Sequence, residues 1–511
     1  MCENHLNNKG KKCYLTRRSF IKTAASSTLI GATLLSHSKS LAGSQIKEKR
    51  ISSGLASKYI PRIKAAFVRR KEDYGILWPG AIYDGEAALQ KYTDLVNKAQ
   101  KEFGVKIDIR SAPIHSSEEA EQWMAEAKAE KPDGLLVLLL DRQNHAWPTA
   151  SSAIKTNIPT VIFAPVGTAF TTNTFIADIL NRGFICSTDD FSQVLYGIKM
   201  IKAGAKLRET RVVVLQGNEM KNVEINHLGT KLVYIPARNF LDEYYKTPVT
   251  AEIQNLADDY IKYAKEMNGP TKQDVINGIK SYVVARNFLE REKADAITMD
   301  CLGALGNTNV SLPCIAWSKL NDVGVPAACE ADLGAVVTHC LVQYLFDRPG
   351  FQQDPVPDTV NKSLIGAHCS CPTRLNGFSA SPEPYYLSHH HGKRDAVPKT
   401  IWPIGQKVTV VNVVLSPNEY GQRVGRYLQR FPSDEKDMRP EMIISVGKVI
   451  GNISVPPSGG CVVSVNVKLD GVDDSSDLLS YPGFHHLFFY GDYKNELKDY
   501  CKLYNIRELV I

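Results

Sequence analysis

The stretch PAACEADLGAVVTHCLVQYLFDRPGFQQDPVPDTVNKSLIGAHCSC, residues Pro326–Cys371, contains several potential metal ligands at the ends of predicted structural elements. A carboxylate directly precedes the predicted helix 331–346, where the helix dipole favours negative charge. Carboxylate and imidazole side chains together suit one hard or borderline divalent ion. The predicted ligands of such an ion are Glu330, Asp354 and His368, with His485 or His486 from the C-terminal tail.

Before this stretch the chain has the pattern of an α/β protein. Short continuous apolar runs alternate with helical patterns, as in a parallel sheet that is covered on both faces. The first set of predicted strands is 63–68, 105–109, 135–140 and 160–164, and the second is 212–215, 232–235 and 296–299. This alternation predicts two consecutive Rossmann-like α/β domains.

Two predicted helices of the first domain have clear signals. Apolar residues recur at steps of three and four along one of them, at Leu89, Tyr92, Val96, Ala99 and Phe103. The next helix begins at a capping box formed by Ser116 and Glu119.

After the quoted stretch the pattern changes to strands. Val463, Val465 and Val467 alternate with polar residues, and the runs 407–414 and 442–455 are rich in Val and Ile. A helix at 493–503 and a strand at 509–511 are expected to end the chain. We therefore predict a mostly antiparallel β-rich C-terminal domain.

These patterns together predict an α/β fold with five successive segments. They are a signal peptide at 1–42, a linker at 43–58, an N-terminal α/β domain at 59–190, a second α/β domain at 191–360 and a C-terminal β-rich domain at 361–511.

The first residues have the pattern of a twin-arginine export signal. Arg17 and Arg18 are followed by Ser, Phe, Ile and Lys, then by a mildly apolar run and the small residues of Ser40-Leu41-Ala42. The apolar run is too short and too rich in Ser and Thr for a stable membrane anchor. We expect export to the periplasm or the extracellular space.

The formal net charge of the 511-residue chain is +7, but it is concentrated in this segment. Residues 1–42 contain seven Lys and Arg and one Glu, so the remainder of the chain is close to +1. Such a balance gives no reason to expect nucleic acid as a partner.

The eleven cysteines have no repeated spacing. Cys369 and Cys371 form a C-x-C pair without a second pair at zinc-finger spacing. The spacing argues against a disulfide framework and against a structural zinc site. Motifs of kinases, esterases and zinc proteases are also missing from the sequence.

Four short stretches resemble the L-fucose and L-arabinose isomerase superfamily. They are ACEADLGA at 328–335, Phe351–Asp354, Gly366–Cys369 and the tail from Gly483 to Asp492. The resemblance covers the chain from about Asp295 onward. The motif of that family usually reads Glu-Gly-Asp where this chain has Glu330-Ala331-Asp332.

The resemblance implies two Rossmann-like domains, a C-terminal β domain and a Mn²⁺ site. It implies that Glu330 and Asp354 are metal ligands that also act as acid and base, and that His368 and His486 complete the ligand set. The implied reaction moves a proton between C1 and C2 of an open-chain monosaccharide through an enediol. We also expect a homo-oligomer.

Other polar residues are expected to contact the sugar because several of them follow predicted strands, where α/β domains bind ligands. These residues are His485, Asp300, Asn144, His145 and His390.

Two alternatives remain open at the level of sequence. Two α/β domains around a cleft also describe an exported carbohydrate-binding protein without turnover. A related epimerase or lyase could use the same metal site.

Overall fold

The computed structural model describes residues 54–72, 76–77, 81–142, 145–390, 394–415, 439–453 and 463–511. The predicted export signal, the linker up to residue 53 and Asn144 lie outside these ranges.

The first sheet has the strand order β4-β1-β5-β6-β7, and every neighbouring pair is parallel. The strands are β1 (Arg62–Val68), β4 (Lys106–Ile109), β5 (Gly134–Leu139), β6 (Thr160–Ala164) and β7 (Gly183–Ser187). The sequence predicted all of these strands except β7. The remaining short elements are α2 (Leu55–Lys58), β2 (Ile76–Leu77) and β3 (Ala81–Ile82).

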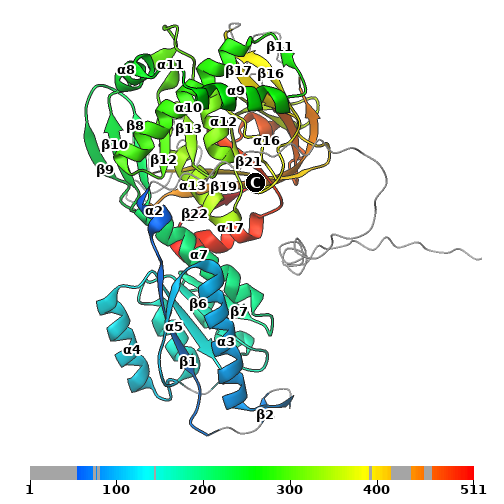
Figure 1. Cartoon of the computed structure of the whole chain (residues 1–511). Helices are drawn as coiled ribbons and strands as arrows, with labels where there is room; N and C mark the ends of the chain where they lie inside the picture. Colours follow the sequence, from blue (N-terminus) through cyan, green and yellow to red (C-terminus); the bar gives the residue numbers. More distant parts are fainter. Residues whose placement is uncertain are drawn as a thin grey trace, which may run out of the picture. The chain divides into compact units, whose positions relative to one another are not determined.

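Helices cover both faces of this sheet (Figure 1). α3 (Gly85–Phe103) and α7 (Ser192–Glu209) pack on one face, and α4 (Ser117–Glu130), α5 (Ala146–Ile154) and α6 (Thr171–Asp178) pack on the other. Both helix predictions from sequence are confirmed. Tyr92, Val96 and Ala99 of α3 are buried, and the Ser116 side chain caps α4 by accepting from the Glu119 N–H.

The second sheet has the strand order β13-β12-β8-β10-β9, and β9 alone is antiparallel to its neighbour within the described residues. The strands are β8 (Arg211–Leu215), β9 (Lys221–Glu224), β10 (Lys231–Ile235), β12 (Ala296–Met299) and β13 (Ala327–Cys329). One face packs against α8 (Arg238–Lys246), α9 (Ala251–Tyr263), α10 (Lys272–Glu292), α11 (Cys301–Leu305) and α12 (Cys314–Asp322).

Six antiparallel strands after this sheet close into a ring in the described part of the chain. The order is β18-β21-β14-β15-β20-β19, and β19 pairs again with β18. The strands are β14 (Phe351–Asp358), β15 (Ser363–His368), β18 (Lys407–Val414), β19 (Glu441–Asn452), β20 (Val463–Leu469) and β21 (His486–Tyr490). The predicted β-rich region is therefore present, and β14 belongs to it although the predicted domain boundary follows that strand.

The interior of the ring is apolar, with Phe351, Val410, Val465 and Phe488 among its buried residues. The helix α16 (Ser475–Leu479) lies near β14, and β22 (Arg507–Val510) extends the sheet beyond β19. A separate small sheet contains β11 (Met267–Asn268), β16 (Tyr385–His390) and β17 (Arg394–Thr400).

The helix α13 (Leu333–Phe346) lies between the second sheet and the ring. Val336 and Leu341 of α13 share one buried cluster with Ala328 of the sheet and with Leu487 and Phe489 of the ring. Because α13 is covered on both sides, nearly all of its residues are buried and its sequence is apolar all round. Its N-terminus is consequently held where the sheet and the ring meet.

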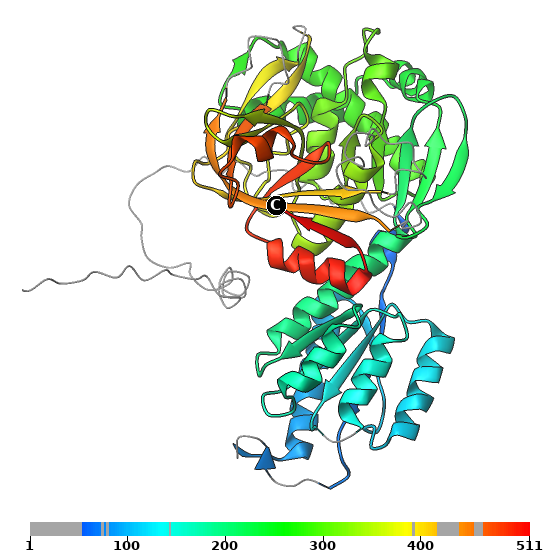
Figure 2. The same cartoon turned by 180° about the vertical axis from the view of Figure 1, so that it is seen from behind.

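The last helix, α17 (Lys494–Tyr504), lies beside α7, as the view in Figure 2 shows. The Tyr196 hydroxyl of α7 donates to the carbonyl of Glu496 at 2.7 Å, and the Tyr504 hydroxyl donates to carbonyls of α7.

Candidate metal centre

The N-terminus of α13 brings residues from four separate segments together. Glu330 directly follows β13, at the carboxyl end of the parallel strands, which is where α/β sheets present ligand-binding side chains. Asp354 lies on β14, His368 ends β15 and His485 directly precedes β21.

The side chains of these residues converge on the imidazole of His485. Its Nε2 lies 3.2 Å from Oδ1 of Asp354 and 3.7 Å from Oε2 of Glu330. Glu330, His368 and His485 each offer one ligand atom, and these atoms lie within 4.8 Å of one another. The four side chains, Glu330, Asp354, His368 and His485, are called the carboxylate–imidazole group below.

Hydrogen bonds fix the orientation of His485. Its Nδ1 lies 2.9 Å from Oδ2 of Asp332, while its Nε2 faces the other two carboxylates. The Asn412 side chain of β18 donates to the backbone carbonyls of Phe484 and His485, at 2.8 and 3.1 Å. A carboxylate on one ring nitrogen leaves the other nitrogen directed at the group, as in metal-binding histidines.

The second carboxylate oxygen of Asp332 has a separate role. Oδ1 accepts the N–H of Ala335 at 2.8 Å and caps α13. One side chain therefore fixes both the start of the helix and the ring of His485.

The charge state of His485 follows from these neighbours. Burial disfavours the imidazolium, but the hydrogen bonds to Asp332 and Asp354 outweigh burial and raise the pKa of His485 to about 9. The acidic residues thus make this position strongly attractive to positive charge.

His368 has the opposite character. It is 5% exposed, and neither of its ring nitrogens makes a hydrogen bond within the described part of the structure. Burial, with the nearby His485, lowers the pKa of His368 to about 4. A buried neutral imidazole without a hydrogen-bond partner is costly unless it binds something else, such as a metal ion.

Three residues at the group adopt left-handed backbone conformations. φ is 61° at Glu330, 53° at Ala331 and 53° at His485. This region costs a non-glycine residue about 1–2 kcal/mol, and such residues cluster at functional sites.

The group is closed on its imidazole side and open on its carboxylate side. The side chain of His485 is 2% exposed, whereas those of Glu330 and Asp354 are 26% and 34% exposed. In the register of the two strands, β21 pairs with β14 only as far as Gln353, one residue before Asp354. Pro355, which cannot donate a backbone hydrogen bond, lies beyond this pairing.

The structure places His486 outside the group. Its Nε2 donates to the Pro482 carbonyl at 2.8 Å, it is fully buried, and burial lowers its pKa to about 4. The expectation that His486 is the tail ligand therefore has to be corrected to His485. His485 lies directly before β21 and has a φ of 53°, so its side chain is not part of the alternation of the strand that begins at His486.

The structure describes three of the other predicted sugar contacts, and none of the three is a member of the carboxylate–imidazole group. Asp300 directly follows β12, beside the end of β13 that leads to Glu330, and it caps α11 by accepting from the Gly303 N–H. His145 precedes α5 of the first sheet. His390 belongs to a different group, described below. Asn144 lies outside the described residues.

Sequence reasoning missed two residues. Asp332 was included only as part of a motif, although its spacing from Ala335 is a capping signal. His339 is a histidine within an apolar helix. It is buried without a hydrogen bond on either nitrogen in the described structure, and burial and His368 lower its pKa to about 3.

The donor set fits a divalent cation such as Mn²⁺. Two carboxylates would neutralise the charge of the ion, and His368 with His485, once the ion has displaced the proton of His485, would complete a mixed ligand set of the kind that borderline ions accept. Because the side chains of Glu330 and Asp354 are partly exposed, a small molecule could reach an ion held there.

Comparisons with known proteins add little to this geometry. No protein-family model matches the chain, and no curated protein matches it. Among solved structures, the chain is similar to the glucose-galactose binding protein GanP from Geobacillus stearothermophilus, with 15% identity over 47% of this chain and 78% of that chain and a TM-score of 0.18.

Two further structures give the same picture. A periplasmic solute binding protein from Actinobacillus succinogenes with bound D-allose shows 13% identity over 56% and 91% of the two chains, with a TM-score of 0.19. The arabinose binding protein AraP from Geobacillus stearothermophilus shows 13% identity over 47% and 74%, with a TM-score of 0.17. At these TM-scores the similarity supports no inference about the present chain.

None of the helices in the described ranges combines the length and the hydropathy needed to cross a membrane.

Proposed function

We propose that the protein is a metal-dependent aldose–ketose isomerase that acts on a free monosaccharide. The observation that supports this proposal most strongly is the carboxylate–imidazole group, which joins four segments distant in sequence. A protein that only binds sugar does not require two carboxylates and two imidazoles around one point.

In the proposed site Glu330, Asp354, His368 and His485 hold a divalent ion, with Mn²⁺ as the candidate. When bound, the ion would stabilise negative charge on the adjacent oxygens of an open-chain sugar. Asp332 keeps Nδ1 of His485 engaged, so that Nε2 is the atom available to the ion.

Glu330 and Asp354 are the proposed acid and base. Both carboxylates are partly exposed and lie on the open side, where a sugar can approach. One carboxylate oxygen can take the proton from the carbon next to the carbonyl and the other group can return a proton to the neighbouring carbon. The buried imidazoles are too enclosed to exchange protons with a substrate in this way.

We further propose export by the twin-arginine route to the periplasm or beyond. This part rests on the sequence pattern around Arg17 and Arg18 alone.

The decisive experiment combines metal analysis with a panel of aldoses. The purified protein is loaded with Mn²⁺, incubated with sugars that include L-fucose and L-arabinose, and assayed for ketose. We expect metal-dependent turnover of at least one sugar. Glu330→Gln and Asp354→Asn should lower kcat by at least about a hundredfold, since general acid–base catalysis contributes at this scale.

A pair of histidine variants provides the matched control. His485→Gln should lose most of the metal affinity, whereas His486→Gln should retain it because the amide can still donate to the Pro482 carbonyl. Turnover of no sugar by a protein that binds sugar tightly, with Asp354→Asn binding it equally well, would contradict the isomerase and favour a carbohydrate-binding protein.

A further inference from the structure

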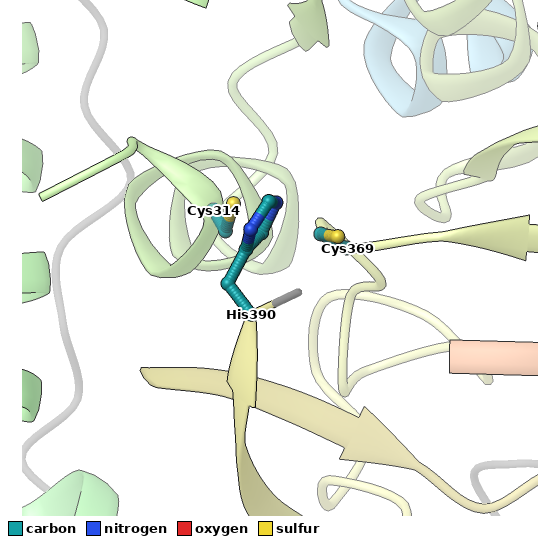
Figure 3. A group of neighbouring side chains, drawn as sticks. All are labelled: Cys314, Cys369 and His390. Carbon is teal, nitrogen blue, oxygen red and sulfur yellow. The ribbon is translucent and has the colours of Figure 1, made fainter. Parts of the chain in front are cut away.

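A second group of potential ligand atoms adjoins the carboxylate–imidazole group in the chain, since Cys369 directly follows His368. Cys314 is the first residue of α12, Cys369 directly follows β15 and His390 ends β16. One sulfur or nitrogen atom from each lies within 4.8 Å of the others, and all three residues are buried. Figure 3 shows that the three side chains point toward one another from three different elements.

We propose that Cys314, Cys369 and His390 bind a soft or borderline divalent ion, with Zn²⁺ as the ion that the chemistry favours. This thiolate–imidazole site is distinct from the carboxylate–imidazole group and does not depend on the isomerase activity.

The donor types support this choice. Thiolate sulfur binds Zn²⁺ well and is a poor ligand for Mn²⁺ and Mg²⁺, which prefer oxygen. Tetrahedral zinc has Zn–S distances of about 2.3 Å and Zn–N distances of about 2.0–2.1 Å, so its ligand atoms are spaced below about 4 Å, within reach of the observed spacing.

The charge balance also supports it. Two thiols release two protons on binding, and two thiolates with a neutral imidazole exactly offset the charge of a divalent ion. The loaded site is therefore neutral, which removes much of the cost of charge in a buried position. The sulfur atoms of Cys314 and Cys369 lie within 4.8 Å of each other, so one ion can reach both.

The position of the site suggests what it does. Cys369 follows His368 in sequence, so an ion on Cys369 holds the end of β15 and with it the backbone of His368. The same ion joins α12 to the small sheet that contains β16. A bound ion would therefore crosslink α12, the residue after β15 and the end of β16, and would hold the backbone next to His368 of the carboxylate–imidazole group.

Sequence spacing argued against zinc because Cys369 and Cys371 have no matching second pair. The structure shows that Cys371 is not a member, since its thiol is directed at the Pro372 carbonyl at 3.4 Å. The partner of Cys369 is instead Cys314, which folding brings close from another element.

The test is cobalt substitution of the purified full chain. Co²⁺ bound by thiolates gives an intense sulfur-to-metal charge-transfer band in the near ultraviolet, which oxygen and nitrogen ligands do not give. We expect this band once Co²⁺ is in enough excess to fill both this site and the carboxylate–imidazole group, and we expect Zn²⁺ to abolish it and Mn²⁺ to leave it unchanged. A wild-type protein that shows no such band at saturating Co²⁺ would overturn the proposal, whether or not any variant folds.

Variants locate the site. Cys314→Ala and Cys369→Ala should each reduce the band by at least tenfold, whereas Cys340→Ala, which removes a buried thiol of α13, should leave it intact. An undiminished band in both site variants would assign the ion elsewhere. A Cys314–Cys369 disulfide in the purified protein, detected by mass spectrometry without reductant, would also overturn the proposal.

Discussion

Asp332 shows how one carboxylate can serve stability and function at once. Its two oxygens face different partners, the Ala335 N–H at the start of α13 and Nδ1 of His485. A change that keeps the first contact and disrupts the second should separate the two roles.

Asp332→Asn is such a change. The amide oxygen can still accept the Ala335 N–H and cap α13. The amide nitrogen would face Nδ1 of His485 and would disfavour the tautomer with its proton on Nδ1, which is the one that presents Nε2 to an ion. We expect metal affinity to fall by about 10–100-fold with little change in stability, as for other residues that orient a metal ligand. Isothermal titration with Mn²⁺ and thermal unfolding measure the two effects.

The N-cap of α3 supplies the control for this prediction. Asp84 accepts the N–H groups of Glu86 and Ala87 far from the group, so Asp84→Asn makes the same chemical change at another helix start. It should leave metal affinity unchanged. Equal affinities of both variants would show that Asp332 does not orient His485.

Individual residues were only partly predictable. Glu330, Asp354 and His368 were predicted as ligands from their order and from a resemblance, and the structure brings their side chains close to His485. The choice between His485 and His486 depends on the left-handed backbone at His485, which no local signal in the sequence indicates. The thiolate–imidazole site could not be predicted from sequence either, because only the fold brings together Cys314, Cys369 and His390 from three separate segments.

At the scale of an element, Asp322 ties the end of α12 to the segment after β15. Its carboxylate is buried and accepts the N–H groups of Thr373 and Arg374, at 2.8 and 2.7 Å, and the Thr373 hydroxyl at 2.6 Å. Burial nevertheless raises the pKa of Asp322 to about 6.

This shift predicts a pH dependence of stability. Because the folded-state pKa lies above the unfolded value, the contribution of Asp322 is fully present below about pH 4 and is lost as pH rises through about 6. Asp322→Asn does not titrate, so its stability relative to wild type should improve by up to about 3 kcal/mol between pH 4 and pH 7. Urea unfolding at both pH values measures the difference.

Asp358 provides a contrasting case. It is a turn carboxylate whose pKa is lowered by hydrogen bonds from Asn361 and Val360. Asp358→Asn should therefore show no gain with rising pH. The prediction for Asp322 fails if the two variants respond to pH alike.

Elements with a strong period were predictable from sequence, and those defined by tertiary pairing were not. The strand 160–164 and the strand 407–414 were predicted at their observed bounds, since the first is apolar after Thr160 and the second contains five valines. β7, with the sequence GFICS, is short and mixed, and β14 contains two prolines. Both become strands because neighbouring strands provide the missing hydrogen bonds.

At the scale of the whole molecule, Asp133 connects the first sheet to the long helix α7. Its buried carboxylate accepts from the Arg62 N–H at 2.6 Å, from the Tyr59 hydroxyl and from the guanidinium of Arg208. The pKa of Arg208 is raised because these charge-assisted bonds outweigh the effect of burial.

Arg208→Met should destabilise the fold by about 1–3 kcal/mol, since it leaves a buried carboxylate without its cation while Arg208 itself is partly exposed. Arg238 is the matched control. It is exposed and pairs with Asp242 at 3.8 Å on the same helix, so Arg238→Met should change stability by less than about 0.5 kcal/mol. Chemical denaturation measures the free energy of unfolding of the two variants. Equal values would show that the contact between Arg208 and Asp133 does not contribute to stability.

In the carboxylate–imidazole group the two carboxylates are partly exposed, whereas the two imidazoles are buried. An ion that arrives from bulk water would meet the carboxylate oxygens first and the ring nitrogens last, so the proposed site would be filled in two stages. Removal of the ion would follow the opposite order, because a bulky chelator could reach it only from the side of the carboxylates. Release should therefore be governed by spontaneous loosening of the inner bonds, at a rate that does not depend on chelator concentration.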